Sequence, residues 1–367
     1  MKYILQLKTG DAELRSLKNI PIEIYANNDL GLLVELTRGR KSKKDEVGDL
    51  QKRITALKSF LSPNTKIYFD VTSESSLSNS QIDDLFDISN GYENWQNLYG
   101  ELYGYFPNSV PMIIVNDIDV DYSNFKSQAL SFVQRYNRIG YKIYPSVGEE
   151  TVKEELAILA SLLEKYSTAE ISIFYDQGYI LDGLVKIAEE QATSYLGIAS
   201  GLFSEFANMS YILTSTSFPD SVTSLSGNME GDIKCAEIAL YNSVMEAMNP
   251  LNIIYSDYGS ITPKRNDDVA YYARGWTPRI DIPIANNERI YYYRMKKENR
   301  DYADVYVDVA KRCVVDVRFP HQLSCWGCQT VQNAAIGMKP GATPSFWISV
   351  RMNIFIYQQL KRLRILQ

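Results

Sequence analysis

The residues with the clearest chemical potential stand at the ends of short apolar runs. In residues 251–260, the apolar run 253–255 is followed at once by Ser256-Asp257-Tyr258-Gly259. This pattern is typical of a buried strand that delivers polar side chains to an open end. Seven earlier stretches end in the same way, and their terminal polar residues are Lys8, Glu35, Asp70, Asn116, Ser146, Asp176 and Ser215.

Four of these terminal residues are carboxylates, namely Glu35, Asp70, Asp176 and Asp257. Buried charges are costly unless they are paired or bind a ligand, so such a set indicates a site. Two of the carboxylates could divide general-acid and general-base catalysis, or the group could hold Mg²⁺, which prefers oxygen ligands and phosphate substrates. The alternative is structural: Lys8 and nearby arginines simply pair with the carboxylates.

A single architecture would bring these strand ends together. Strand-like runs alternate with helical patterns, which predicts a (β/α)8 TIM-like barrel over residues 1–260. The expected strands are 3–7, 32–36, 66–69, 112–115, 142–144, 171–175, 211–213 and 253–255. Residues 232–248 read as a helix stopped by Pro250. In such barrels the active site lies at the C-terminal ends of the strands, where Lys8, Asn116 and Ser146 would bind ligand.

The pattern changes after the eighth strand. Residues 279–284 and 289–295 flank Ala285-Asn286-Asn287-Glu288, which is a β-hairpin signal, and helical patterns follow. We therefore expect a C-terminal hairpin and helical extension, residues 261–367, packed on the barrel. Arg274, Arg279 and Tyr293 on or near the hairpin could bind phosphate and stack on a ligand. Alternatively, the hairpin aromatics pack on the barrel while its arginines face water.

The cysteine-rich tail allows a metal site. Cys313, His321, Cys325 and Cys328 could complete a tetrahedral structural Zn²⁺ site. The pattern contains a single CxxC without a second paired knuckle, so the alternative is a helix start with buried sulfurs. His321 is the only histidine, so a Ser-His-Asp triad has no support.

Composition excludes several classes of protein. The chain has 367 residues, is 45% hydrophobic and 22% charged, and carries a net charge of −6. An acidic total argues against a general nucleic-acid binder. No apolar run is long enough to span a bilayer and the N-terminus lacks signal-peptide features, so we expect a cytoplasmic protein without a membrane partner.

Short motifs scattered over almost the whole chain resemble the phage beta protein family, found in phages and in bacterial mobile or defence-linked loci. They are Lys8-Thr9-Gly10-Asp11, Leu33-Val34-Glu35, Ser256-Asp257-Tyr258-Gly259, Cys325-Trp326-Gly327, Phe346-Trp347-Ile348 and Arg351-Met352-Asn353. In this chain Asp11 replaces an expected glutamate, and Cys328 replaces a residue that is more often acidic. The resemblance implies a barrel in a phage or antiviral defence setting, and it supplies no catalytic residues.

Two functional hypotheses remain open. In the first, the barrel binds, and perhaps hydrolyses, a small phosphate-bearing ligand at the strand ends. Glu35, Asp70, Asp176 and Asp257 would then be acid–base groups or cation ligands, while Lys8 and Arg279 neutralise phosphate. In the second, the chain is a non-enzymatic module that binds a partner protein through the Tyr/Arg-rich hairpin and the C-terminal helices.

Overall fold

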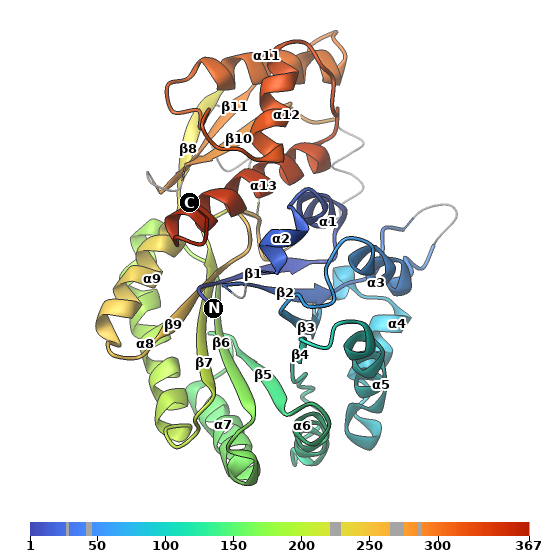
Figure 1. Ribbon diagram of the computed structural model, residues 1–367, viewed down its shortest axis with the longest axis vertical. Helices are drawn as coiled ribbons and strands as arrows, with labels where there is room; N and C mark the ends of the chain where they lie inside the picture. Colours follow the sequence, from blue (N-terminus) through green and yellow to red (C-terminus); the bar gives the residue numbers. More distant parts are fainter. Residues whose placement is uncertain (27–28, 42–45, 221–228, 265–274, 285–287, 367) are drawn as a thin grey trace. The chain divides into compact units, whose positions relative to one another are not determined.

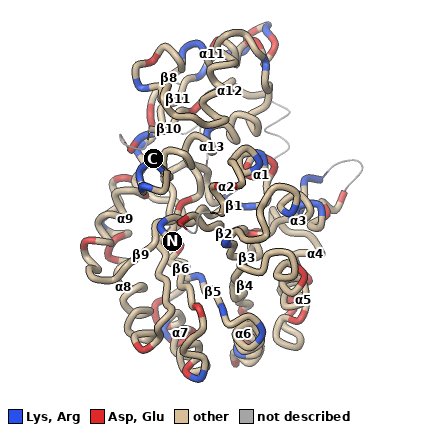
Figure 2. Tube along the Cα trace, in the orientation of Figure 1, with Lys and Arg blue, Asp and Glu red and all other residues tan. Residues whose placement is uncertain are grey.

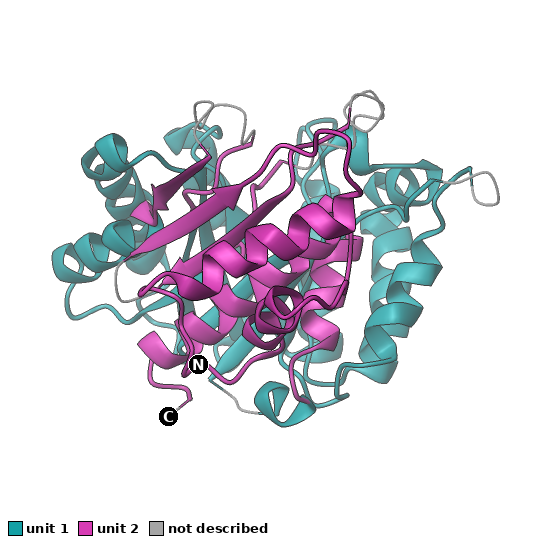
Figure 3. Ribbon diagram, turned by 90° about the horizontal axis from the view of Figure 1, so that it is seen from above, with its two compact units in different colours: residues 1–9, 22–215, 237–257 teal, residues 10–21, 216–236, 258–367 magenta. Residues whose placement is uncertain are grey.

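The chain folds into two compact units that interleave along the sequence (Figure 3). The computed structural model describes residues 1–26, 29–41, 46–220, 229–264, 275–284 and 288–366. Unit 1 comprises Met1–Thr9, Ile22–Ser215 and Glu237–Asp257, and unit 2 comprises Gly10–Pro21, Thr216–Ala236 and Tyr258–Gln367. Neither unit is therefore one continuous stretch of sequence.

Unit 1 is built on an eight-stranded sheet with the order β4-β3-β2-β1-β9-β7-β6-β5 (Figure 1). The strands are β1 (Tyr3–Lys8), β2 (Leu30–Leu36), β3 (Ile67–Val71), β4 (Val110–Pro111), β5 (Arg138–Ile143), β6 (Glu170–Tyr179), β7 (Met209–Thr216) and β9 (Ile253–Asp257). A parallel bridge between Met112 and Gly140 joins the two ends of the sheet, and the Ile113 amide donates to the Gly140 carbonyl at 2.8 Å. These contacts nearly close the barrel and confirm the predicted (β/α)8 TIM-like fold.

A glycine lies where the barrel closes. A Cβ atom at Gly140 would meet the sulfur of Met112, so a larger residue here would force the flexible Met112 side chain to move. The predicted fourth strand, residues 112–115, is misplaced, because the regular strand is Val110–Pro111. The reason is that the Gln128 side chain, rather than a neighbouring strand, pairs with the backbone of Ile114. Gln128 Nε2 donates to the Ile114 carbonyl and Gln128 Oε1 accepts from the Ile114 amide, both at 3.0 Å.

Helices accompany the strands of unit 1. They are α2 (Ile22–Tyr25), α3 (Leu50–Lys58), α4 (Ser80–Asp83), α5 (Ser89–Tyr105), α6 (Ser123–Tyr136), α7 (Glu149–Leu163), α8 (Val185–Leu202) and α9 (Ala236–Ala247), with 3-10 turns η1 (Ser75–Leu77), η2 (Asp84–Phe86), η3 (Glu164–Tyr166) and η4 (Asp182–Leu184). Helix α7 shows how the local sequence favours a helix that packs on one face. Glu149 and Glu150 lie in its first turn, where the helix dipole favours negative charge, while Leu156, Leu159 and Leu163 form its buried stripe.

Unit 2 combines a small antiparallel sheet with helices. The sheet has the order β10-β11-β8, and its strands are β10 (Arg279–Ile284), β11 (Arg289–Arg294) and β8 (Glu230–Lys234). Its helices are α1 (Asp11–Lys18), α11 (Tyr302–Val315), α12 (Trp326–Ala335) and α13 (Pro344–Arg362). The predicted hairpin and C-terminal helices are present. The prediction of a helix from residue 232 is wrong for residues 232–234, which belong to β8. The sequence of β8 does not alternate between apolar and polar residues, because only Ile233 is buried.

One buried amide links three helices of unit 2. The Asn353 side chain on α13 accepts from the Gly327 amide of α12 at 2.9 Å, and it donates to the carbonyls of Ser16 and Asn19 at 3.4 Å. Asn353 is fully buried, and the Ser16 carbonyl also accepts from the Asn19 amide at 3.2 Å, so Asn353 adds to the local hydrogen bonds that end α1.

The distribution of charged and apolar residues in the structure agrees with the composition of the sequence. Figure 2 shows basic and acidic residues interspersed along the helices of both units. Across the part of the chain that the structure describes, no helix combines the length and the apolar character needed to cross a membrane.

Candidate functional site

The interior of the barrel is identified by its core. Ile4, Leu33, Tyr68, Phe174, Ile212 and Ile254 pack into one buried cluster although they come from six different strands, so they face inward. Side chains alternate between the two faces of a strand, so residues two positions later face the same way. The residues that continue the inward rows toward the C-terminal strand ends are Gln6, Lys8, Glu35, Asp70, Asp176, Thr214 and Ser256.

Lys8 and Glu35 form the first ion pair of this inward set. Lys8 Nζ lies 2.5 Å from Glu35 Oε1, and both side chains are about nine-tenths buried. They stand opposite each other in the β1–β2 register. Burial alone would raise the pKa of Glu35, but attraction to Lys8 and Lys142 and hydrogen bonds from Lys8 and Thr72 lower this pKa to about 2. Glu35 is therefore a carboxylate at any physiological pH.

Lys142 and Asp70 form the second ion pair. Lys142 Nζ contacts Asp70 Oδ2, and their side chains are 6% and 7% exposed. Burial disfavours the ammonium form, but attraction to Asp70, Glu35 and Asp176 holds the pKa of Lys142 well above its usual value. Burial raises the pKa of Asp70, and repulsion from Glu35 adds to this effect, while Lys142 opposes it. The two environments therefore shift the pKa values of these carboxyl groups in opposite directions, down for Glu35 and up for Asp70.

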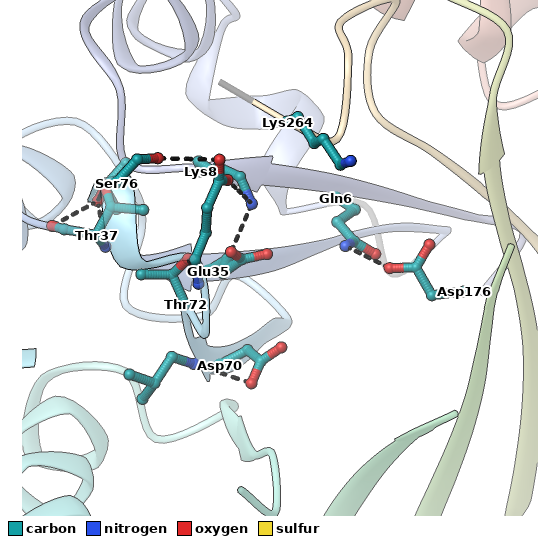
Figure 4. Close-up of polar contacts among 12 residues, drawn as sticks. Gln6, Lys8, Glu35, Thr37, Asp70, Thr72, Ser76, Asp176 and Lys264 are labelled. Atoms are coloured by element: carbon teal, nitrogen blue, oxygen red, sulfur yellow. Dashed lines mark hydrogen bonds and ion pairs between the residues drawn. The ribbon is translucent and has the colours of Figure 1, made fainter. Parts of the chain in front are cut away.

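The remaining inward groups are polar but uncharged, apart from Asp176. Gln6 Nε2 donates to Asp176 Oδ2 at 2.9 Å (Figure 4). Thr214 and Ser256 stand opposite each other on β7 and β9. Within the described residues, Thr214 Oγ1 and Ser256 Oγ are buried without a hydrogen-bond partner. We call Gln6, Lys8, Glu35, Asp70, Lys142, Asp176, Thr214 and Ser256 the inner ring.

Two of the predicted strand-end residues face the other way. Asp257 follows the inward Ser256, so it points to the outer face of the sheet, where it accepts a hydrogen bond from Tyr3 Oη at 2.9 Å. Ser215 follows the inward Thr214 and also faces outward. Both are buried, but the structure does not bring them into the inner ring.

The other predicted ligand-binding residues of unit 1 are also outside the ring. Asn116 is engaged by its own loops: its side chain donates to the Phe86 carbonyl at 3.0 Å and accepts from the Ile118 amide at 3.3 Å. Ser146 lies beyond the end of β5 and is exposed. Arg274, the predicted ligand-binding residue next to the hairpin, belongs to the other unit and lies outside the described residues.

The hairpin residues are packed within unit 2. Arg279 is paired with Asp281 at 2.5 Å, and its side chain is 8% exposed. Tyr293 is 5% exposed, and its hydroxyl contacts Asp316. Both side chains are therefore held in the interior of this unit.

The predicted zinc ligands do not converge. Cys325 caps α12 and its sulfur accepts from the Cys328 amide at 3.3 Å, whereas His321 is exposed and its Nε2 lies 3.1 Å from the Val314 carbonyl. Burial raises the pKa of Cys313 well above its usual value, which disfavours the thiolate that zinc requires. Among the residues that the structure describes, no three His, Cys, Asp or Glu side chains gather as a group that could hold a metal ion.

Sequence reasoning missed half of the inner ring: Gln6, Lys142, Thr214 and Ser256. For Lys142 a signal existed, since a lysine in the middle of Gly140-Tyr141-Lys142-Ile143-Tyr144 is unusual in a buried strand. The predicted fifth strand did include this residue, but the polar residue after the strand was taken as the candidate.

A comparison with known protein families identifies one that spans the chain. The Beta protein family model matches residues 3–361, so the chain belongs to the Beta protein family, as its motifs predicted. This membership suggests a phage-associated protein. Neither the curated proteins nor the solved structures contain a match.

Proposed function

We propose that this member of the Beta protein family is a cytoplasmic protein of phage–host conflict that binds a small phosphate-bearing ligand inside the inner ring. The observation that carries the proposal is a pair of buried, unpartnered hydroxyl groups, Thr214 and Ser256, on the same inward face as two buried lysines. Buried hydroxyls without partners are costly, and a ligand oxygen would satisfy them.

The charges of the ring constrain the ligand. The two lysines, Lys8 and Lys142, are each paired with a carboxylate, Glu35 and Asp70, so neither lysine has charge left over to neutralise a phosphate dianion. A divalent cation that enters with the phosphate supplies the missing positive charge. Mg²⁺ suits this role, because it needs only one or two protein carboxylates beside the phosphate oxygens. We therefore propose that the ligand binds as its Mg²⁺ complex.

Asp70 gives the ring a chemical as well as a binding role. Burial raises the pKa of Asp70, so this carboxyl group takes up a proton more readily than Glu35, whose pKa is about 2. Lys142 stays protonated beside Asp70 and would stabilise negative charge that develops on the ligand. Hydrolysis of the ligand, with Asp70 as the proton-transfer group, is the reaction that this arrangement supports best.

The test is a thermal-unfolding screen against nucleotides and sugar phosphates, with and without Mg²⁺. A ligand at a hundredfold excess over its Kd stabilises the folded state by about 2.7 kcal/mol. We expect a shift that requires Mg²⁺ and that weakens in Thr214→Val, with a loss of about tenfold in affinity for one charge-assisted hydrogen bond. Asp70→Asn should retain binding but lose turnover.

Two matched controls come from the outward row. Ser215→Ala removes a buried hydroxyl adjacent to Thr214, and Asp257→Asn neutralises a buried carboxylate adjacent to Ser256. Both variants should bind like the wild type. If the screen shows no shift, or if Thr214→Val and Ser215→Ala weaken binding equally, the inner ring is not a ligand site.

A second candidate function is binding of a partner protein by the helices of unit 2. It is favoured by four exposed apolar side chains. Val315 ends α11 and Val317 follows it, and they are 79% and 98% exposed. Ile336 and Met338 follow α12, and they are 80% and 55% exposed. Replacement of Val317 and Ile336 by serine should then abolish co-purification of the partner from infected cells, while the inner-ring variants should have no effect on it.

A further inference from the structure

Unit 2 contains a buried charge cluster that the inner ring does not involve. Arg279 and Asp281 lie on β10, two residues apart and therefore on the same face, and Arg351 lies on α13. Asp281 bridges the two arginines: Oδ1 lies 2.5 Å from Arg279 Nε, and Oδ2 lies 2.8 Å from Arg351 Nη1. The three side chains are 8%, 7% and 5% exposed.

The positive charge of this cluster is not balanced. Two guanidinium groups share one carboxylate, and both terminal nitrogens of Arg279, Nη1 and Nη2, are buried without a hydrogen-bond partner within the described residues. Arg351 Nε is likewise buried without a hydrogen-bond partner within the described residues. Burial, together with repulsion from Arg279, lowers the pKa of Arg351 although Asp281 opposes this effect. Burial of an unpaired charge is strongly unfavourable, so the cluster is short of one anion.

Aromatic rings lie against the two guanidinium groups. The Arg279 guanidinium carbon lies 4.4 Å from the centre of the Tyr292 ring and 5.9 Å from that of Phe218, and the corresponding Arg351 carbon lies 3.7 Å from Phe218. Tyr292 can lie across β8 because residue 231 is glycine: a Cβ at Gly231 would be 2.6 Å from the tyrosine hydroxyl. Because Nε contacts Asp281 and the guanidinium carbon lies against Tyr292, Nη1 and Nη2 are the atoms left for a further partner.

We infer that Arg279 and Arg351 form an oxyanion-binding site within unit 2. The two parallel N–H groups of a guanidinium edge match the two oxygens of a phosphate or a carboxylate, which accept both hydrogen bonds at once. One such group neutralises the surplus charge and satisfies Arg279 Nη1 and Nη2. Asp281 holds Arg279 through Nε and so leaves the terminal nitrogens to the ligand.

This site is independent of the proposed function of unit 1. It requires no divalent cation, because its surplus charge is positive, whereas both lysines of the inner ring are already paired with carboxylates. The test therefore uses inorganic phosphate, and separately acetate, in metal-free buffer containing chelator, with chloride at matched ionic strength as the reference. Thermal unfolding reports binding to the folded state, and phosphorus NMR line broadening reports phosphate binding directly.

The key variant is Arg279→Met, which removes the unpaired charge and leaves Asp281 and Arg351 as a balanced pair. It should fold, with an unfolding temperature in chloride no lower than that of the wild type, and its affinity for the oxyanion should fall about tenfold or more. Arg300→Met is the matched control, since Arg300 is an exposed arginine of unit 2 paired with Asp308. This control should bind like the wild type.

Each outcome is decisive. Stabilisation by phosphate that Arg279→Met abolishes supports a phosphate site, and the same result with acetate supports a carboxylate site. If neither anion stabilises the wild type, or if Arg279→Met and the wild type respond alike, water satisfies the guanidinium and the inference fails. Thr214→Val should not alter the response, so failure of the inner ring as a site would leave this result unaffected.

Discussion

Glu35→Gln is the sharpest test of the electrostatics of the inner ring. The folded-state pKa of Glu35 is about 2, against an ordinary value of 4.5. At about 1.4 kcal/mol per pH unit, this difference corresponds to roughly 3 kcal/mol of stability at pH 7. Because the folded-state pKa is the lower one, the contribution is fully present above the unfolded-state pKa and is lost as the pH falls through about 2.

The assay is urea unfolding of the wild type and Glu35→Gln between pH 7 and pH 3. We expect the wild type to be more stable by about 3 kcal/mol at pH 7 and by only about 1 kcal/mol at pH 3, where the unfolded chain is already protonated at this position. Glu74→Gln is the control, since Glu74 lies 4.0 Å from Lys8 and is 28% exposed. Its effect should stay under about 1 kcal/mol. A Glu35→Gln difference that is independent of pH would refute the assignment of Glu35 as a permanent anion.

Two further predictions concern buried polar groups. Lys142→Met should destabilise the protein by about 3–5 kcal/mol in urea unfolding, because it leaves Asp70 and Glu35 without their shared cation; a loss under about 1 kcal/mol would mean that the ring is hydrated. Asn353→Leu should cost about 1–3 kcal/mol in thermal unfolding, because the Gly327 amide loses its acceptor, and an unchanged unfolding temperature would argue against that hydrogen bond.

The fold could be predicted from the sequence because parallel strands buried on both faces are short apolar runs with abrupt polar ends. Which polar residues face inward could not be predicted in the same way. In β9 all five residues are buried, so the sequence carries no alternation that distinguishes the inner from the outer face. Only the packing of Ile254 in the barrel core shows that Ser256 faces inward and Asp257 outward.

The partners of ion pairs between residues far apart in the sequence could not be predicted either. Lys142 and Asp70 are 72 residues apart, and Asp281 and Arg351 are 70 residues apart. A charged residue in a strand or a helix gives no indication of its partner, because the partner is decided by closure of the barrel in one case and by packing of α13 on β10 in the other. The hairpin arginine was identified from the sequence, but its bridge to Arg351 was not.

The interleaving of the two units affects how this protein can be made and dissected. The first helix of unit 2, α1, directly follows the first barrel strand, yet its helical neighbour α13 begins only at Pro344. Unit 2 therefore cannot be completed during translation until α13 has been synthesised. No single truncation separates the units, and a cut between residues 257 and 258 would leave α1 attached to the barrel without its partner helix.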